Sequence, residues 1–416
     1  MITYPQNTEE TGRAWGKTEL KILMVNKFLH PAGGAETYTF KLGAYWSANG
    51  HEVEYFGMHH PDNVVGNRWN LYTGTLDFHR QGIRSNLVNP FKLVYSAEAK
   101  QKIGKILSAF EPDVLHINNF NYQLTPSILL AVEEYRKTHR KRIQVVYTAH
   151  DPQLVCPNHY MYSPQKHQVC DKCLHGSFGN CIRERCIHHS VLRSGLGTAE
   201  AVYWNRRKVY RSIDVIVCPS LFMKQALDTN PMLAAKTVVL RNFVEPVAPQ
   251  APQKGNYVLY FGRYSEEKGL RMLLEVCREL PHIPFVFAGG GPLEPMLCGI
   301  QNVKNVGFLK GKELEDVIRG ARFSVCPSEC NENCPFSVIE SMMHGTPVLG
   351  SDRGGIPELI EDGQNGWLFS VGDPAVLKNR LNRIWNSDEP ERFANACQRV
   401  PFDSLGEYAK KLLEFY

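Results

Sequence analysis

The stretch from Glu329 to Glu358, ECNENCPFSVIESMMHGTPVLGSDRGGIPE, indicates the fold more strongly than any other part of the chain. After Pro335, which the first turn of a helix tolerates, apolar residues recur at helical spacing. Gly345 and Pro347 end that pattern, and residues 348–349 predict a short buried strand. A helix that begins in a loop presents free backbone N–H groups and its positive dipole end, which suit a phosphate group.

Two glutamates frame the expected helix start. Glu332 lies just before it and Glu340 lies within it, with seven residues between them. Taken alone, they could be a dipole partner and a solvated helix residue, each contributing about 0.3 kcal/mol. A phosphate site with an acid on either side instead suits a ligand that carries both phosphate and hydroxyl groups, such as a nucleotide sugar.

Further motifs follow the E-x7-E spacing: Gly345-Thr346-Pro347-Val348, Gly354-Gly355-x-x-Glu358 and Asn365-Gly366. This combination resembles the donor site of the family-four retaining glycosyltransferases. The resemblance implies an α/β protein of the GT-B type, with two facing Rossmann-like doubly wound domains and a cleft between them. It also implies that a sugar moves from a nucleotide diphosphate sugar to an acceptor hydroxyl, with retained configuration, in glycan, polysaccharide or glycolipid biosynthesis.

Length and charge set the outer limits. The chain has 416 residues, enough for two domains with separate cores. Its net charge of +5 is too mild to indicate a nucleic-acid partner. No apolar run is long enough to span a bilayer, and the polar residues 1–19 lack a signal segment, so we expect a cytoplasmic location. The basic runs 136–142 and 206–211 are typical of solvated faces; contact with the inner membrane face is the alternative.

The first domain is expected over residues 1–246, with strands at 20–25, 51–56, 113–117, 144–148 and 214–217. Its first loop, Pro31-Ala32-Gly33-Gly34-Ala35-Glu36, could be a plain turn, but it resembles the family's PxxGGxE loop, which implies that Gly34 faces the donor. His150 follows the strand 144–148, at the carboxyl edge where α/β sheets bind ligands. The resemblance implies that His150 lies beside the reacting sugar.

The second domain is expected over residues 257–400, after a linker at 247–256 rich in proline and polar residues. Residues 401–416 are expected to form a helix that returns to the first domain. A strand at 257–261 precedes Arg263 and Lys268-Gly269, which resemble the family's FGR-x4-KG motif. The resemblance implies that both cations neutralise the donor diphosphate, and two fixed cations would offset the charge on a departing nucleotide.

The same resemblance implies the remaining donor contacts. Glu332 would hold hydroxyl groups of the donor sugar, and Glu340 would hold the ribose. The amides near Phe336 and Ser337 would contact sugar or phosphate. Glu332 and His150 are therefore the candidate catalytic residues of the chain.

An insertion over about 152–203 interrupts the α/β pattern and is rich in cysteine. Cys170-x-x-Cys173 is a short bite suited to a tetrahedral metal, and Cys181 and Cys186 could complete a four-thiolate site. Zinc is the favoured metal, although an iron–sulfur cluster would use the same ligands. Reduced cysteines packed within a lid are the alternative interpretation.

No residue stands out as a covalent nucleophile, so we expect a same-face mechanism in which the leaving phosphate helps to deprotonate the acceptor. The chain contains no D-x-D motif, so no catalytic metal is expected. The expected partners are a nucleotide-sugar donor and a glycan or lipid-linked acceptor. The alternatives are a phosphorylase or a nucleotide-sugar epimerase of the same fold, or a non-catalytic subunit that binds a nucleotide sugar.

Overall fold

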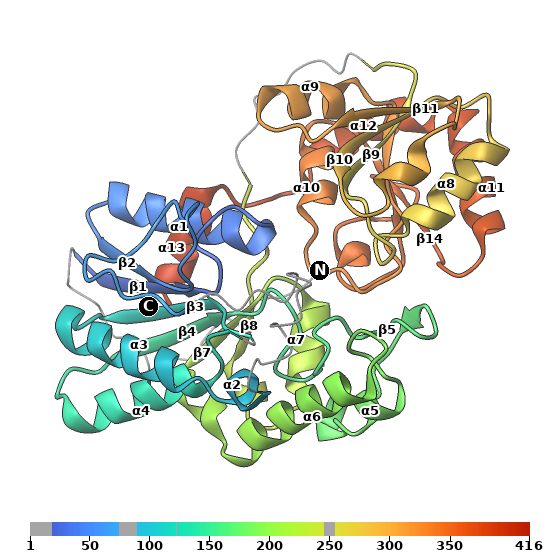
Figure 1. The fold of residues 1–416 in the computed structure, drawn as a ribbon. Coiled ribbons are helices and arrows are strands. Elements are labelled where there is room, and N and C mark those ends of the chain that lie inside the picture. Colours follow the sequence, from blue (N-terminus) through green and yellow to red (C-terminus); the bar gives the residue numbers. More distant parts are fainter. Residues whose placement is uncertain (1–18, 75–89, 122, 245–253) are drawn as a thin grey trace.

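The chain forms two lobes, each built around its own sheet (Figure 1). The structure is a computed structural model that describes residues 19–74, 90–121, 123–244 and 254–416. Most of the predicted linker, and the polar N-terminal segment, lie outside these residues.

The first lobe has a six-stranded, all-parallel sheet in the order β2-β1-β3-β4-β7-β8. Sheets of this kind are covered on both faces, which explains why their strands are nearly continuous apolar runs. The strands are β1 (Lys21–Asn26), β2 (Glu52–Phe56), β3 (Val114–Asn119), β4 (Gln144–Thr148), β7 (Val215–Cys218) and β8 (Thr237–Val239).

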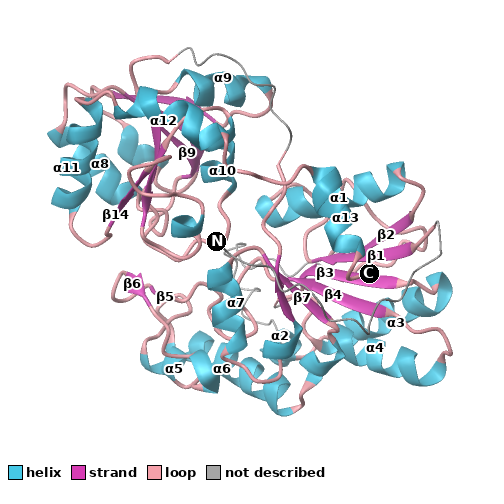
Figure 2. Cartoon of the chain, turned by 180° about the vertical axis from the view of Figure 1, so that it is seen from behind, coloured by secondary structure: helices cyan, strands magenta, loops and turns pink. Residues whose placement is uncertain are grey.

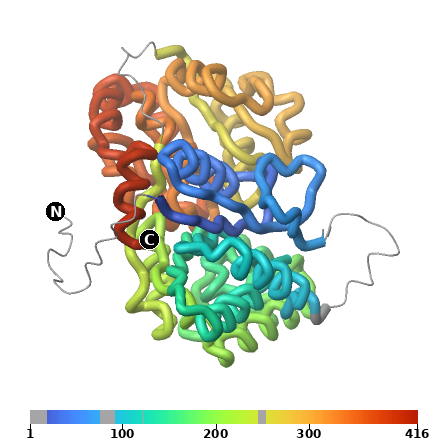
Figure 3. The backbone as a smooth tube through the Cα atoms, turned by 90° about the vertical axis from the view of Figure 1, so that its left-hand side faces the viewer, coloured from blue at the N-terminus to red at the C-terminus, as the bar shows by residue number. Residues whose placement is uncertain are grey.

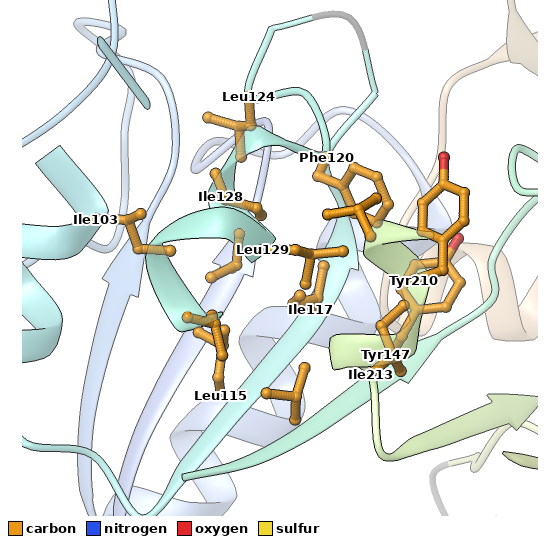
Figure 4. Close-up of a cluster of buried hydrophobic side chains, with 14 of the residues drawn as sticks. Ile103, Leu115, Ile117, Phe120, Leu124, Ile128, Leu129, Tyr147, Tyr210 and Ile213 are labelled. Carbon is orange, nitrogen blue, oxygen red and sulfur yellow. The ribbon is translucent and has the colours of Figure 1, made fainter. Parts of the chain in front are cut away.

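Helices cover both faces of this sheet and create two hydrophobic cores. One core joins the strands to α3 and α4, where Ile103, Ile128 and Leu129 pack against Leu115 and Ile117 (Figure 4). The other core joins the opposite face to α1. The helices of this lobe are α1 (Gly34–Ala48), α2 (Pro90–Val94), α3 (Ala97–Phe110), α4 (Ser127–Thr138), α5 (Asn180–Arg183), α6 (Val191–Arg206) and α7 (Leu221–Asp228).

The second lobe repeats this design with a parallel sheet in the order β11-β10-β9-β12-β13-β14. Its strands are β9 (Val258–Arg263), β10 (Phe285–Gly290), β11 (Val303–Gly307), β12 (Phe323–Cys326), β13 (Val348–Ser351) and β14 (Trp367–Phe369). Its helices are α8 (Leu270–Glu279), α9 (Lys312–Gly320), α10 (Phe336–Met343), α11 (Pro374–Trp385) and α12 (Glu389–Gln398). The fold is therefore the expected pair of Rossmann-like domains of the GT-B type.

The last helix, α13 (Leu405–Leu413), lies against α1 of the first lobe (Figures 2 and 3). Tyr408 is fully buried there, and its hydroxyl lies 2.7 Å from that of Tyr38. Ser404 and Glu407 form a capping box that fixes where α13 begins. The chain thus crosses back to the first lobe after it has completed the second.

The insertion has little regular structure before α6 begins at Val191. A short antiparallel pair, β5 (Tyr162–Ser163) with β6 (Gln168–Val169), extends from it toward the second lobe (Figure 2). Tyr162 Oη donates to Glu329 Oε2 at 3.5 Å, and Asn331 Nδ2 donates to Met161 O at 3.4 Å. The insertion therefore touches the loop of the second lobe that precedes α10.

Acidic partners hold part of the basic run at 136–142. Arg136 bonds to Asp214 and to the carbonyl of Ser212, and Lys141 lies 3.1 Å from Asp113 Oδ1. These two cations therefore have structural roles within the first lobe. Among the described residues, no helix combines the length and the apolar character that crossing a membrane requires.

Candidate functional site

A cavity of about 630 Å³ lies between the two lobes, at the carboxyl ends of both sheets; we call it the cleft cavity. Loops that follow β1 and β4 line it from the first lobe, and loops that follow β9 and β12 line it from the second. The structure brings most of the predicted site residues to this cavity: Gly34, His150, Arg263, Lys268, Glu332, Phe336 and Ser337.

Lys268 and Glu332 form a close ion pair in this cavity. Lys268 Nζ lies 2.5 Å from Glu332 Oε1, which also accepts a hydrogen bond from Ser328 Oγ at 2.5 Å. Burial opposes the charge of Lys268, but attraction to Glu332 outweighs it, so the pKa of Lys268 is raised. The ammonium group is therefore permanently charged and held in one place.

Gly269 explains why the lysine reaches this position. Its φ of +71° lies in the left-handed region, and a Cβ there would come within 1.9 Å of the carbonyl oxygen of Pro327. Only glycine fits this contact between the start of α8 and the end of β12. The Lys-Gly pair of the motif is thus required by packing as well as by charge.

Arg263, at the end of β9, is exposed to the cleft. Within the part of the chain that the structure describes, its guanidinium makes no salt bridge. Phe336 begins α10 after Pro335, and no side chain caps this helix start. Free amides at a helix start attract anions. The cavity therefore offers two cations and a helix start on the side of the second lobe.

Gly34 lies opposite this helix start. A Cβ at Gly34 would lie 3.5 Å from the ring of Phe336, so the two lobes approach each other closely here. His150 lines the same side of the cavity, and its Nε2 is 3.1 Å from Asn118 Oδ1. Burial lowers the pKa of His150 to about 4, so its imidazole is neutral near pH 7. A neutral imidazole can orient a sugar, but it places no positive charge beside the sugar.

Glu340 is the one predicted donor residue that does not line the cavity, and its contact with ribose stays a prediction. It lies on α10, where burial raises its pKa to about 7 and Lys41 of the first lobe opposes the shift.

Lys27 and Asp151 line the cavity but were not predicted as site residues. Burial lowers the pKa of Lys27, against the attraction of Asp151 and Glu36, and burial raises the pKa of Asp151 to about 6. Both residues follow strands of the first sheet, Lys27 directly after β1 and Asp151 shortly after β4. The rule that ligands bind at the carboxyl ends of strands, applied to every strand, would have found them.

Glu358 makes a contact between the lobes. Its Oε2 accepts from the amide of Leu221 at 2.8 Å, and its Oε1 accepts from the amide of Phe222 at 2.7 Å. A carboxylate of the second lobe thus caps the start of α7 in the first. Ser220 Oγ also donates to Asn333 Oδ1 at 2.7 Å, beside this cap. These bonds hold the two lobes together at the edge of the cleft.

The four cysteines predicted to bind metal lie around one small cavity, together with a fifth. They are Cys170, Cys173, Cys181 and Cys186, with Cys156 beside them. Among the described residues, however, no group of three or more His, Cys, Asp or Glu side chains is placed to hold a metal ion. The structure therefore does not support the predicted zinc site, nor an iron–sulfur cluster with the same ligands.

The surroundings of these cysteines are largely apolar. Cys173 and Cys181 pack with Phe178 and Ala201 in a small apolar cluster. Burial raises the pKa of Cys173 to about 12 and that of Cys156 to about 11, so both thiols are protonated near pH 7. Protonated, buried thiols act as small apolar groups. This arrangement agrees with the alternative of reduced cysteines packed within a lid.

Comparison with known proteins identifies related sequences for both lobes. The model of glycosyltransferase family 4 matches residues 32–247, and the model of group 1 glycosyl transferases matches residues 255–387. The sulfoquinovosyl transferase SQD2 of Arabidopsis thaliana is 32% identical over 149 residues, which cover 34% of this chain and 29% of that protein. The amylovoran biosynthesis glycosyltransferase AmsK of Erwinia amylovora is 34% identical over 143 residues, which cover 30% of this chain and 35% of that protein. The matched segments thus span only about a third of these two relatives.

Solved structures match over nearly the whole chain. HepE from Anabaena, in complex with UDP and glucose, has a TM-score of 0.63 at 17% identity and covers 95% of this chain and 98% of that one. The sucrose-phosphate synthase of Thermosynechococcus elongatus has a TM-score of 0.65 at 16% identity, with the same coverage. At this level of identity, the likeness shows a shared two-domain fold.

Proposed function

The chain belongs to glycosyltransferase family 4, and from this we propose that it transfers a sugar from a nucleoside diphosphate sugar to an acceptor hydroxyl with retained anomeric configuration. The observation that carries this proposal is the set of charges on the second-lobe side of the cleft cavity. Arg263, Lys268 and the start of α10 face one space, and Glu332 is fixed beside them. A diphosphate next to a sugar matches this distribution of charge and hydrogen-bonding groups.

Each residue then has a distinct role. Arg263 and Lys268 bind the diphosphate and stabilise the charge that develops when it leaves. The amides of Phe336 and Ser337 bind a phosphate oxygen or a sugar hydroxyl. Glu332, fixed by Lys268 and Ser328, accepts hydrogen bonds from hydroxyl groups of the donor sugar. Neutral His150 approaches the sugar from the first lobe.

The reaction needs no nucleophile from the protein. The bond between the anomeric carbon and the leaving phosphate oxygen breaks while the acceptor oxygen forms its bond on the same face. The acceptor proton passes to the leaving phosphate, so charge and atoms balance. Glu332 is held in its ion pair with Lys268, which leaves it poorly suited to attack the sugar.

The names of relatives and neighbours support the substrate classes. HepE was solved with UDP and glucose, which makes a uridine diphosphate sugar the first donor to test. Relatives named for sulfoquinovosyl transfer and for amylovoran biosynthesis support an acceptor in glycolipid or polysaccharide synthesis. On this proposal the enzyme works in the cytoplasm, at or near the inner face of a membrane.

A thermal-shift screen over UDP-, GDP- and ADP-sugars tests the proposal, because a ligand that binds only the folded state raises its melting temperature. We expect one nucleotide class to stabilise the wild-type protein and to lose its sugar when an acceptor is present. Turnover without an acceptor would indicate an epimerase, and turnover that requires inorganic phosphate would indicate a phosphorylase. Stabilisation without any turnover would indicate a non-catalytic subunit.

A further inference from the structure

A second cavity, of about 710 Å³, lies between the insertion and the second lobe; we call it the insertion cavity. On one side it is lined by residues of the insertion, including Tyr162, His167 and His189. On the other side lie Ser265, Glu266 and the turn after β10. It meets the cleft cavity at six shared residues: Lys27, Asp151, His159, Tyr160, Arg263 and Glu267.

This junction places the insertion cavity next to the proposed reaction centre. Arg263 lines both cavities, so a ligand in the insertion cavity would lie against the same cation that holds the donor diphosphate. Charges at the junction are balanced, since Lys27 and Arg263 face Asp151 and Glu267. A site with balanced charges does not select a strongly anionic ligand.

The lining of the insertion cavity suits a carbohydrate. Glu266 supplies a carboxylate and His167 supplies an imidazole, whereas the amides of Asn121 and Asn158 are hydrogen-bonded within the protein. A carboxylate accepts hydrogen bonds from hydroxyl groups, and a neutral imidazole can donate one and accept another. Tyr160 is 55% exposed, which is unusual for a large aromatic side chain, and its ring stands at the junction. An aromatic face of this kind can cover the C–H face of a sugar ring.

Backbone strain is concentrated around the same cavity. His159, His167, His188 and His189 all line it, and all four have left-handed backbone angles, with φ values of 65°, 49°, 49° and 56°. Met161, on the other side of Tyr160, has a φ of 46°. Residues other than glycine pay about 1 kcal/mol or more for this conformation, and such residues cluster at ligand sites. These strained positions flank Tyr160 and carry the histidines that line the cavity.

We propose that the insertion cavity is the acceptor subsite and that it binds the acceptor through a sugar unit, with Tyr160 beneath the ring and His167 and Glu266 at its hydroxyl groups. This inference rests on the proposed transfer reaction. The thiol cluster supports the site from behind, since Cys186 lines both the cysteine cavity and the insertion cavity. The bonds from Tyr162 to Glu329 and from Asn331 to Met161 join the insertion to the second lobe.

The test uses ligand-observed NMR on the full chain, saturated with whichever of UDP, GDP or ADP binds best. The sugar probes are maltose, methyl α-D-glucopyranoside, methyl β-D-galactopyranoside and methyl α-D-mannopyranoside. We expect at least one probe to bind, and we expect Tyr160→Ala and His167→Ala each to weaken it at least about fivefold more than they weaken the nucleotide. Tyr203→Ala is the matched control, because Tyr203 is 37% exposed on α6 and lines neither cavity.

Each outcome has one meaning. Loss of probe binding in the two variants, but not in the control, supports the acceptor subsite. Nucleotide binding without any probe binding overturns it and leaves the proposed donor site intact, as does probe binding that is the same in all variants. If no nucleotide binds to the wild-type protein, the proposed function itself fails and the acceptor subsite fails with it.

Discussion

The two walls of the cleft differ in how they are built. The wall of the second lobe places its charges at the ends of regular elements, with Lys268 before α8 and Phe336 at the start of α10. Between residues 158 and 189, the wall of the insertion has only short elements, such as β5 and β6 of two residues each and α5 of four, and it shapes its surface with strained loops and packed thiols. A wall built on regular elements has a recognisable sequence pattern, whereas a wall built on loops is set by contacts between distant residues.

The largest expected effect lies on the second-lobe wall. Lys268→Ala should lower sugar transfer by roughly a hundredfold or more, because a fixed charge at the leaving group is lost. The measurement is the initial rate with saturating acceptor, together with the melting temperature to confirm folding. Lys304→Ala is the control, because Lys304 is exposed on β11 away from the cavity. A Lys268→Ala rate equal to that of wild type would contradict the role of this wall.

A smaller effect is expected at the glutamate fixed by Lys268. Glu332→Gln keeps the shape of the side chain but removes its charge, so transfer should fall by roughly tenfold to a hundredfold while nucleotide affinity changes little. Calorimetry with the free nucleotide, beside the transfer rate, separates the two quantities. An equal loss in both would mean that Glu332 binds the nucleotide and not the sugar.

Glu340 predicts a pH dependence. Its pKa is raised to about 7, so the carboxylate that would accept a hydrogen bond from ribose forms only as the pH rises through that value. Nucleotide affinity should therefore increase by a few-fold between about pH 6 and pH 8. Ionisation of the nucleotide itself contributes, so the difference between wild type and Glu340→Gln isolates the residue. Parallel pH profiles for the two proteins would refute the ribose contact.

The raised pKa of Glu340 also affects stability, and with rising pH this effect is opposite in sign to the effect on nucleotide affinity. A carboxyl group with a raised folded-state pKa holds its proton longer in the folded than in the unfolded chain. The free energy of unfolding should therefore decline as the pH rises from the ordinary range of glutamate through about 7. Glu340→Gln should flatten this decline in a denaturant titration.

The smallest effect on catalysis is expected for substitutions of the insertion's clustered cysteines. Cys173→Ser buries a hydroxyl in an apolar cluster and should lower the free energy of unfolding by about 1–3 kcal/mol. Cys170→Ser, at a more exposed position, should cost less. Nucleotide affinity should be unchanged in both variants. A larger loss in Cys170→Ser would show that these thiols have a role other than packing.

Four residues predicted for the donor site on the second lobe lie together in the structure, and their roles stay predictions. Arg263, Lys268, Glu332 and Phe336 belong to motifs with fixed spacing, and the structure brings them to one cavity. Glu340 shares the motif but does not line that cavity. Spacing alone could not predict this, since it does not show which side of a helix faces the ligand. The strands β8, β11 and β14 were missed because they are short or lie at sheet edges, where the apolar pattern is weak.

The residues that line the cleft cavity from the first lobe were harder to predict. Lys27 and Asp151 come together only when β1 and β4 join one sheet, and Glu358 reaches α7 only when the lobes meet. The cysteine spacing suggested a metal site, but the structure packs Cys173, Cys181 and Cys186 in an apolar cluster, and no metal-binding group is found among the described residues. Spacing cannot distinguish these two uses of a cysteine, since both require the thiols to lie close together.

Calorimetric titration of UDP, GDP and ADP into the wild-type protein and Arg263→Ala measures donor recognition most directly. We expect one nucleotide to bind the wild-type protein with one-to-one stoichiometry. Its affinity for Arg263→Ala should be about tenfold weaker, a loss of about 1.4 kcal/mol. Failure of all three nucleotides to bind, or equal affinity for both proteins, would contradict a nucleoside diphosphate site on the second-lobe wall.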